Sequence, residues 1–270
     1  MQFYNHLKGW CDVSAPMEDN LKAYEFITGC SKEGLCNASR EVAKAFEVLP
    51  EDVKIISSED EQWVPDITGV PFLYVRGDVS LLKRPSISVV GTRQPSAEGI
   101  EATKKTVDML GSEYVIVSGL AKGIDGAAHI EALAKNFRTI AVLGTPINVY
   151  YPPEHEQLQE YIAKDNLVVS QFGPSRAVQQ YFFMERNLTM SQISQGSVVV
   201  ESSDAGGGVK QAQYSEKQGK PVFIFKNVYD NAQLDWPKRF ESPVVVPSFE
   251  MLFECVRNPG NYTVNQQKLF

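Results

Sequence analysis

The residues best suited to chemistry in this sequence form a turn with the letters SGLAKGID at residues 118–125. Gly119 and Gly123 bracket Lys122 directly after the apolar run 115–117. Glycine allows a sharp turn and a close approach of the backbone to a ligand, and free N–H groups at a helix start attract anions. Together with Ser118, these residues predict a turn that binds phosphate.

Two polar residues follow this turn. Asp125 is placed to cap the next helix, and His129 lies four residues further on, on the same helical face. We expect His129 to be a structural hydrogen-bonding residue and not a catalytic base.

A second turn, at residues 91–96, follows an earlier apolar run. Gly91 permits the turn, while Thr92, Ser96 and the start of the next helix offer donors to an anion. Arg93 adds a guanidinium group suited to phosphate. The alternative reading is an ordinary turn in which Ser96 caps the helix.

Two further segments carry candidate binding residues. Near the start of an expected helix, Arg186 and Asn187 can bond phosphate or base edges, and the aromatic residues at 181–183 can stack on bases. At least one of these aromatics is expected in the core. Further on, Gly206 and Gly207 belong to a run of three glycines that can cradle an anion; a mobile surface loop is the alternative.

Apolar runs rich in valine and isoleucine alternate with stretches of helical periodicity from residue 71 onward. The predicted strands are 87–90, 115–117, 139–143, 167–169, 198–200, 222–225 and 244–246, and the predicted helices are 97–110, 126–135, 153–164, 184–194, 209–218 and 249–256. Such short continuous runs are typical of strands buried on both faces of a parallel sheet. The pattern predicts an α/β protein with an extended, Rossmann-like, doubly wound and mainly parallel sheet.

The chain is expected to divide into a small helical N-terminal domain at residues 1–61, the Rossmann-like domain at 62–258 and a tail at 259–270. Because ligands bind beyond the carboxyl ends of parallel strands, all four candidate segments are expected at one edge of the sheet.

Several classes of protein are excluded by missing motifs. The sequence has no G-x-G-x-x-G after the first strand, no G-x-x-x-x-G-K-[ST] and no G-x-S-x-G. These absences disfavour a dinucleotide oxidoreductase, a P-loop NTPase and a serine hydrolase. The four cysteines and three histidines show no metal-binding spacing, so we expect neither metal nor cofactor.

Composition and charge restrict the ligands and the cellular compartment that we expect for this protein. With 33 acidic and 26 basic residues the formal charge is −7, which excludes a broadly basic nucleic-acid coat but leaves room for a local basic pocket. The start of the chain lacks the pattern of a secretory signal, and no apolar run reaches membrane-spanning length. We expect a cytoplasmic protein with reduced thiols.

The motifs together resemble the DprA/Smf family, the DNA-processing protein A family. The resemblance covers residues 66–256 and rests on PFLYVRG at 71–77, ISVVGTRQPS at 87–96, VSGLAKGIDGAAH at 117–129, TIAVLG at 139–144 with YPPE at 151–154, and FFMERN at 182–187. It implies single-stranded DNA gripped by its phosphates at the strand ends. It also implies a homodimer that helps load the RecA recombinase on incoming strands during natural transformation.

The resemblance also assigns residues. It matches Arg93 to the family's Gly-Ser/Thr-Arg arginine, Ser118, Gly119 and Lys122 to its Ser-Gly-x-Ala-Arg/Lys-Gly-Ile-Asp turn, and Arg186 and Asn187 to the start of its Arg-Asn-Arg motif. The departures are Leu188 for the second arginine, Thr145-Pro146 for Cys-Gly, residues 206–212 for the Ser-Gly-Ser/Thr…Thr-Ala stretch, and Lys226-Asn227 for Pro-Gly. They indicate a divergent member.

Two alternatives use the same pocket. One is a nucleoside-monophosphate phosphoribohydrolase of the related Rossmann-like superfamily, whose Gly-Gly-x-Gly-Thr-x-x-Glu motif has Val209 and Ala212 here in place of Thr and Glu. The other is a sensor that binds a nucleotide. We favour single-stranded DNA binding without catalysis, and we expect Arg93 and Arg186 to lie in the pocket and not in the core.

Overall fold

The computed structural model describes residues 49–64, 66–70, 72–174 and 176–264 of the chain. Residues 1–48 of the expected N-terminal domain lie outside this part. No helix among the described residues is long and apolar enough to span a membrane.

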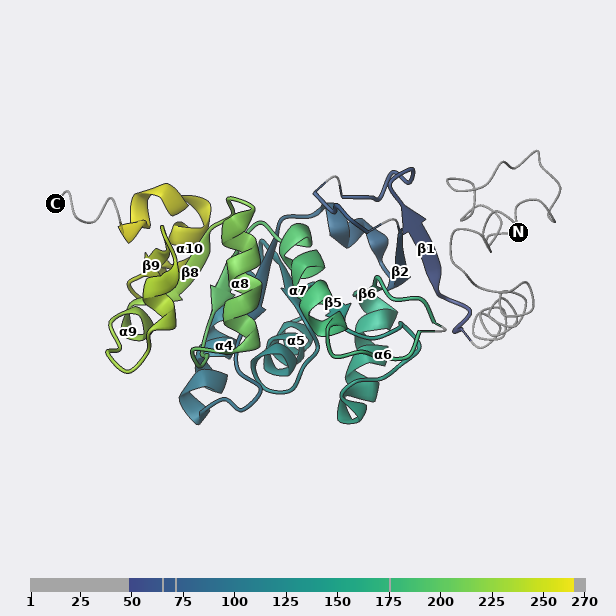
Figure 1. Ribbon diagram of the computed structural model, residues 1–270, viewed down its shortest axis with the longest axis horizontal. Coiled ribbons are helices and arrows are strands. Elements are labelled where there is room, and N and C mark those ends of the chain that lie inside the picture. Colours follow the sequence, from purple (N-terminus) through teal and green to yellow (C-terminus); the bar gives the residue numbers. More distant parts are fainter. Residues whose placement is uncertain (1–48, 65, 71, 175, 265–270) are drawn as a thin grey trace, which may run out of the picture. The chain divides into compact units, whose positions relative to one another are not determined.

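One nine-stranded sheet organises the described residues (Figure 1). Its strands are β1 (Lys54–Ser57), β2 (Phe72–Gly77), β3 (Ser86–Val90), β4 (Val115–Ser118), β5 (Thr139–Leu143), β6 (Leu167–Ser170), β7 (Ser197–Val199), β8 (Val222–Phe225) and β9 (Val244–Val246). They lie in the order β1-β2-β6-β5-β4-β3-β7-β8-β9. Strands β3 to β9 pair with one another only in parallel, which confirms the predicted α/β class and mainly parallel sheet.

The edge formed by β1 and β2 differs from the sequence-based expectation. Strand β2 pairs antiparallel with β6, and β1 pairs antiparallel with β2. The sheet therefore begins before residue 62, where we expected the larger domain to start. Strand β2 escaped prediction because it is a short apolar run with antiparallel partners on both sides, so no helix connects it to a parallel neighbour.

Helices fill the connections between parallel strands. They are α4 (Ala97–Leu110), α5 (Ile124–Ala134), α6 (Glu156–Asp165), α7 (Phe182–Ile193), α8 (Gly207–Lys217), α9 (Lys226–Tyr229) and α10 (Phe249–Arg257), with short 3-10 turns η1 (Val79–Lys83), η2 (Pro153–His155), η3 (Trp236–Arg239) and η4 (Pro259–Tyr262). Helix α4 has the bounds that the sequence predicts. Its N-cap is Ser96, whose Oγ accepts the Gly99 N–H at 3.0 Å, so the capping alternative for this serine is confirmed.

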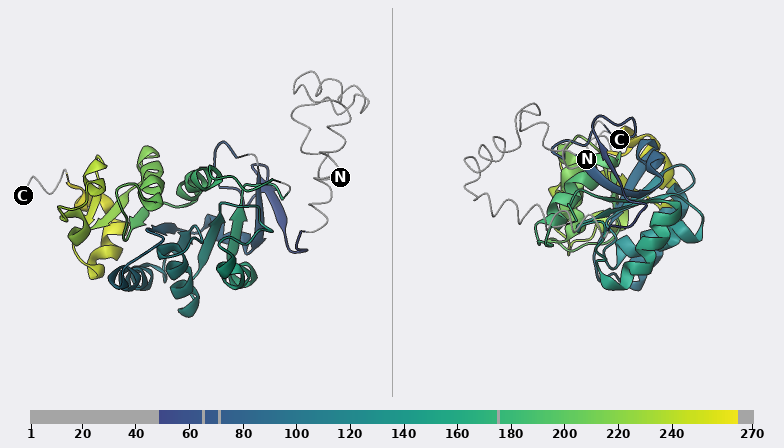
Figure 2. Two further views of the ribbon diagram at one scale, coloured as in Figure 1. Left: turned by 60° about the horizontal axis from the view of Figure 1, so that its bottom comes forward. Right: turned by 90° about the vertical axis from the view of Figure 1, so that its right-hand side faces the viewer.

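The sheet is covered on both faces. Alternate strand residues face two separate cores: Val90, Val117 and Val142 pack in the core shared with α7 and α8, and Val89 and Ile116 in the core shared with α4, α5 and α10. In the left view of Figure 2 the green helices lie on one side of the strands and the blue-to-teal helices on the other. This arrangement is a doubly wound sheet.

The direction of winding reverses at β3, which pairs with β4 on one side and β7 on the other. In such sheets the crevice beyond the carboxyl ends of these two strands is the usual ligand site. The turns after β3 and β7 carry Arg93 and Gly206 respectively.

Candidate functional site

The turns after β3, β4 and β7 lie together at the carboxyl edge of the sheet. The Thr92 N–H donates to the Glu201 carbonyl at 2.7 Å, and the Ile124 N–H donates to the Thr92 carbonyl at 3.2 Å. Main-chain hydrogen bonds therefore join three of the four segments selected from the sequence. Their convergence depends on backbone geometry and not on a ligand.

Glycines make this convergence possible. A Cβ on Gly208 would lie 3.0 Å from the Gly91 Cα, and a Cβ on Gly123 would clash with the backbone of Thr92 and Arg93. Gly123 also has a φ of +77°, a conformation that residues with a Cβ rarely adopt. These glycines are thus required for packing of loop against loop, independently of any ligand.

Arg186 is buried and not in an open pocket, so the expectation for its location is wrong. Only 5% of the residue is exposed. Its guanidinium donates to the Val142 carbonyl at 2.9 Å and to the Gly119 carbonyl, and its Nε donates to Asn187 Oδ1 at 3.1 Å. Asn187 is buried as well. Arg186 thereby connects the turn after β4 with the end of β5, and Asn187 holds the guanidinium in place.

The charge of Arg186 is balanced by Asp125. Burial raises the pKa of Asp125, while the positive charge of Arg186 and the Ala121 N–H lower it. The expectation that Asp125 caps α5 is wrong. Gly123 occupies the N-cap position, and Asp125 lies in the first helical turn. Its role is to neutralise the guanidinium beneath the turn.

Ser118 and Ser96 also serve the fold. Ser118 is fully buried, and its Oγ donates to the Val89 carbonyl at 2.7 Å. The Ser96 N–H and Oγ both donate to the Glu201 carboxylate, the hydroxyl at 2.8 Å. The anion at the start of α4 is therefore a side chain of the protein itself, and this helix end has no need of phosphate.

Arg93 is an exposed cation beside aromatic rings at this edge. Its guanidinium lies over the Phe183 ring, 5.7 Å from the centroid. Within the described residues Arg93 forms no ion pair. The Phe183 ring in turn lies 5.1 Å from the Tyr151 ring, which is 44% exposed. Arg93, Phe183 and Tyr151 form a cation beside an aromatic surface, which we call the rim cluster.

Tyr151 was missed as a binding residue by the sequence reasoning. It stands in the YPPE motif at residues 151–154, which carried family information but no chemical signal of its own. Of the three aromatics at 181–183, Phe182 is buried and stacks on Phe172 with ring centroids 4.1 Å apart. This confirms that at least one of them belongs to the core, while Phe183 is half-buried and Tyr181 is exposed.

Carboxylates lie among the cations of this edge. Lys122 forms an ion pair with Glu154, and both side chains are about half exposed. The ion pair lowers the pKa of Glu154. Because Lys122, Arg186 and the α4 N-terminus each have an acidic partner, the edge carries a mixture of charges and differs from the basic pocket that the sequence suggested.

No group of three or more metal-ligating side chains occurs in the described ranges. The glycine run after β7 has one open position: a Cβ on Gly207 would meet nothing within 4 Å, whereas one on Gly206 would clash with Ser202. Gly207 is exposed. Thr92, Arg93, Lys122, Gly123, Gly206 and Gly207 thus remain accessible at the edge, at least in part.

His129 is a structural hydrogen-bonding residue, as predicted. It is fully buried, and its Nδ1 lies 2.7 Å from Thr139 Oγ1. Its Nε2 has no hydrogen-bond partner within the described ranges. Burial, with a smaller effect from the charge of His155, lowers the pKa of His129 to about 3.

This low pKa makes stability depend on pH. In the unfolded chain the imidazole binds a proton below pH ~6.5, whereas in the folded protein it stays neutral down to pH about 3. The contribution of the neutral imidazole to the free energy of unfolding is therefore complete above pH ~6.5. Below that pH the free energy of unfolding falls by about 1.4 kcal/mol per pH unit. We expect His129→Asn, which can keep the bond to Thr139, to flatten the fall in unfolding free energy between pH ~6.5 and ~4.5. Equal slopes in urea titrations of parent and variant would contradict this account.

The chain shows sequence similarity to known proteins. A protein-family model described as DNA recombination-mediator protein A matches residues 54–239. The DNA processing protein DprA of Streptococcus pneumoniae is 40% identical over 151 residues, which cover 56% of this chain and 54% of that protein. DprA of Bacillus subtilis is 34% identical over 174 residues, 63% of this chain and 59% of that protein. The chain thus spans between half and two thirds of the length of these relatives.

Two solved structures are similar in fold. The X-ray structure of DNA processing protein A from Streptococcus pneumoniae has a TM-score of 0.72 and 29% identity, covering 94% of this chain and 90% of that chain. A structure that describes the single-stranded DNA binding mode of DNA processing protein A from Helicobacter pylori has a TM-score of 0.65 and 22% identity. It covers 77% of this chain and 96% of that chain. The latter similarity concerns the fold alone.

Proposed function

Because this chain belongs to the DNA recombination-mediator protein A family, we propose that it binds single-stranded DNA at the carboxyl edge of its sheet and does so without catalysis. The DNA processing protein A from Helicobacter pylori, which shares the fold, is described as binding single-stranded DNA. In this chain the proposed contact set consists of the accessible residues of the edge and the two aromatic residues of the rim cluster: Thr92, Arg93, Lys122, Gly123, Gly206, Gly207, Tyr151 and Phe183.

The rim cluster is the observation that carries the proposal. Proteins that bind single strands combine cations for the phosphates with aromatic rings for the bases. Arg93 supplies a guanidinium with no carboxylate partner in the described part of the chain, and the rings of Phe183 and Tyr151 lie next to it. Each base stacked on such a ring contributes about 1–3 kcal/mol with little dependence on sequence.

The buried groups beneath this edge set its shape and are not contacts. Arg186, Asn187 and Ser118 satisfy internal carbonyl and amide groups, and Ser96 is held by Glu201. We therefore leave these four out of the proposed contact set and assign them to positioning of the loops.

The structure gives the hydrolase alternative little support. Val209 and Ala212, which replace the threonine and glutamate of the phosphoribohydrolase motif, are both buried in the core beneath α8. Glycosidic cleavage by that route needs a carboxyl group to donate or accept a proton. A nucleotide-binding sensor stays the alternative that binding experiments must separate from DNA binding.

The test is fluorescence anisotropy with a labelled oligodeoxythymidylate over a series of salt concentrations. DNA binding predicts saturable binding whose logarithmic affinity falls linearly with the logarithm of salt, by about 0.7 for each phosphate contacted. The same oligonucleotide as a duplex is the control. If the single strand fails to bind at low salt, or a mononucleotide competes as well as the strand, the DNA proposal is wrong.

Membership of the family also suggests the oligomeric state, the partner protein and the cellular process that we propose for this activity. A cytoplasmic homodimer would pass the bound strand to a RecA recombinase during DNA uptake in natural transformation. Light scattering tests the dimer. RecA filament formation on strands coated with a single-strand-binding protein tests the transfer, and an unchanged rate of filament growth would refute it.

A further inference from the structure

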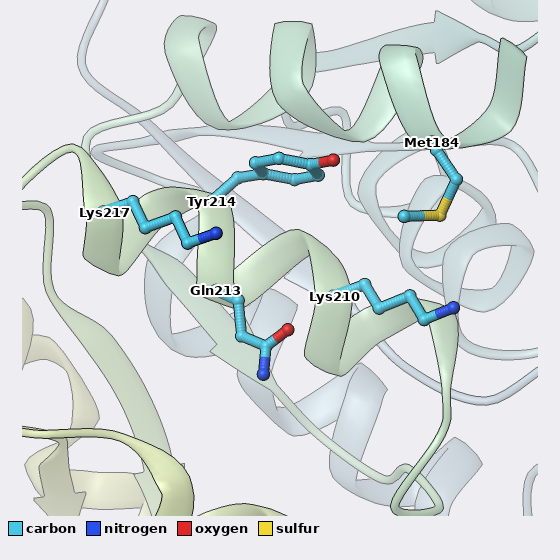
Figure 3. Close-up of a pocket in the computed structure, with 5 residues that line it drawn as sticks. All are labelled: Met184, Lys210, Gln213, Tyr214 and Lys217. Atoms are coloured by element: carbon cyan, nitrogen blue, oxygen red, sulfur yellow. The ribbon is translucent and has the colours of Figure 1, made fainter. Parts of the chain in front are cut away.

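A shallow groove runs between α7 and α8, on the face of the sheet opposite α4 and α5 (Figure 3). It has a volume of about 200 Å³ and is lined by Met184, Lys210, Gln213, Tyr214 and Lys217. Met184 extends from α7 toward α8, and the other four side chains belong to α8. None of these residues belongs to the contact set proposed above.

The two lysines lie on one side of α8. Lys210 and Lys217 are seven residues apart, which is about two helical turns and about 10 Å along the axis. Both are exposed, and neither forms an ion pair with the described residues. The single carboxylate of this helix, Glu216, accepts the Glu241 N–H at 2.7 Å. The groove thus presents two cations without an acidic partner among the described residues, whereas Lys122 at the edge of the sheet is paired with Glu154.

An aromatic ring lies between the two cations. Tyr214 is half-buried, and its ring lies along the groove between α7 and α8. Gln213 also lines the groove, but its side chain points away from α7 in Figure 3. A ring and two separated cations form a combination suited to a base and its flanking phosphates.

The groove begins at the rim cluster. Met184 follows Phe183 directly in the first turn of α7, and Lys210 lies in the first turn of α8, two residues after Gly208. Both helices start at the carboxyl edge of the sheet, so the groove leads from this edge along α8 toward Lys217. A strand stacked on Phe183 can enter it without a change of face.

We propose that the groove between α7 and α8 is a second subsite for single-stranded DNA, in which Lys210 and Lys217 hold phosphates and Tyr214 stacks a base. This inference rests on the proposed function, because it extends the path of the same strand. Its specific content is that the binding site of this chain is longer than the edge of the sheet.

The test compares oligodeoxythymidylates of about 6 and about 20 nucleotides, the shorter able to occupy only one subsite. The variant Lys210→Ala with Lys217→Ala should lower affinity for the long strand by about 5- to 20-fold and reduce its salt slope by about 1.4, which corresponds to two phosphates. Affinity for the short strand should change less than twofold. The control is Lys104→Ala with Lys164→Ala, which removes the same charge from two exposed lysines of α4 and α6.

Photocrosslinking with 4-thiothymidine gives an independent measurement. The long strand should crosslink to a peptide that contains Tyr214 or Met184 in the folded parent protein. The groove proposal is overturned if the double variant binds the long strand like its control and no such crosslink forms. If the parent binds neither strand, the proposed function itself fails, which is a different result from a loss confined to the groove.

Discussion

Arg186→Ala is expected to lower the free energy of unfolding by about 3–5 kcal/mol, the largest loss for any single substitution at this site. The substitution leaves the buried Asp125 without its counter-charge and leaves the carbonyls of Gly119 and Val142 without a donor. An unpaired charge away from water costs more than the contact that was lost. The measurement is chemical denaturation at neutral pH, followed by circular dichroism.

Two further variants identify the cause. Adding Asp125→Asn to Arg186→Ala should restore part of the stability, because it removes the unpaired charge although the two carbonyls stay unsatisfied. Arg186→Lys should fall between the parent and Arg186→Ala, since an ammonium keeps the charge but cannot reproduce the planar set of donors. If Arg186→Ala costs less than about 1 kcal/mol, the arginine is not a structural element of the core.

Arg93→Ala should have the second large effect, on binding and not on stability. We expect affinity for single-stranded DNA to fall by about tenfold and the salt slope to fall by about 0.7, because one phosphate contact is removed. Stability should change by no more than about 0.5 kcal/mol, since the side chain is exposed. Tyr151→Ala should also weaken binding, through the loss of stacking, but should leave the salt slope unchanged.

Matched variants test the position of the effect. Arg84 is an exposed arginine that precedes β3 at the opposite, amino edge of the sheet, so Arg84→Ala removes an equal charge from the wrong edge. Its affinity should equal that of the parent. Glu154→Gln should bind modestly more tightly, because it releases Lys122 and removes a carboxylate that repels phosphate. If Arg84→Ala and Arg93→Ala lose the same affinity for single-stranded DNA, binding depends on net charge alone and not on the position of the arginine.

The parallel part of the fold could be predicted from sequence because its strands are buried on both faces. The runs that form β3, β5 and β8 are short and rich in apolar residues, above all valine and isoleucine, and every residue of these strands is buried. The antiparallel edge carried no comparable signal. Strand β1 has a single buried residue, Ile56, and its pairing with β2 joins segments that are distant in sequence.

The candidate site was predictable in its position and less so in the roles of its residues. Turns after parallel strands must meet at one edge, so the convergence of the Gly91 and Gly119 turns followed from the strand assignment. Sequence alone could not show that Arg186 points inward, because arginine is almost never fully buried unless it is paired, and its partner Asp125 is distant in sequence. Nor could it show that Glu201 occupies the start of α4.

The three consecutive glycines of the β7 turn differ in what surrounds them, and this difference has a practical use. A Cβ on Gly206 or Gly208 would collide with neighbouring atoms, while Gly207 opens to solvent beside the edge of the sheet. A fluorescent or spin label can therefore be attached at position 207 without a clash with the loops. The label would lie close to the strand that we propose to bind at this edge.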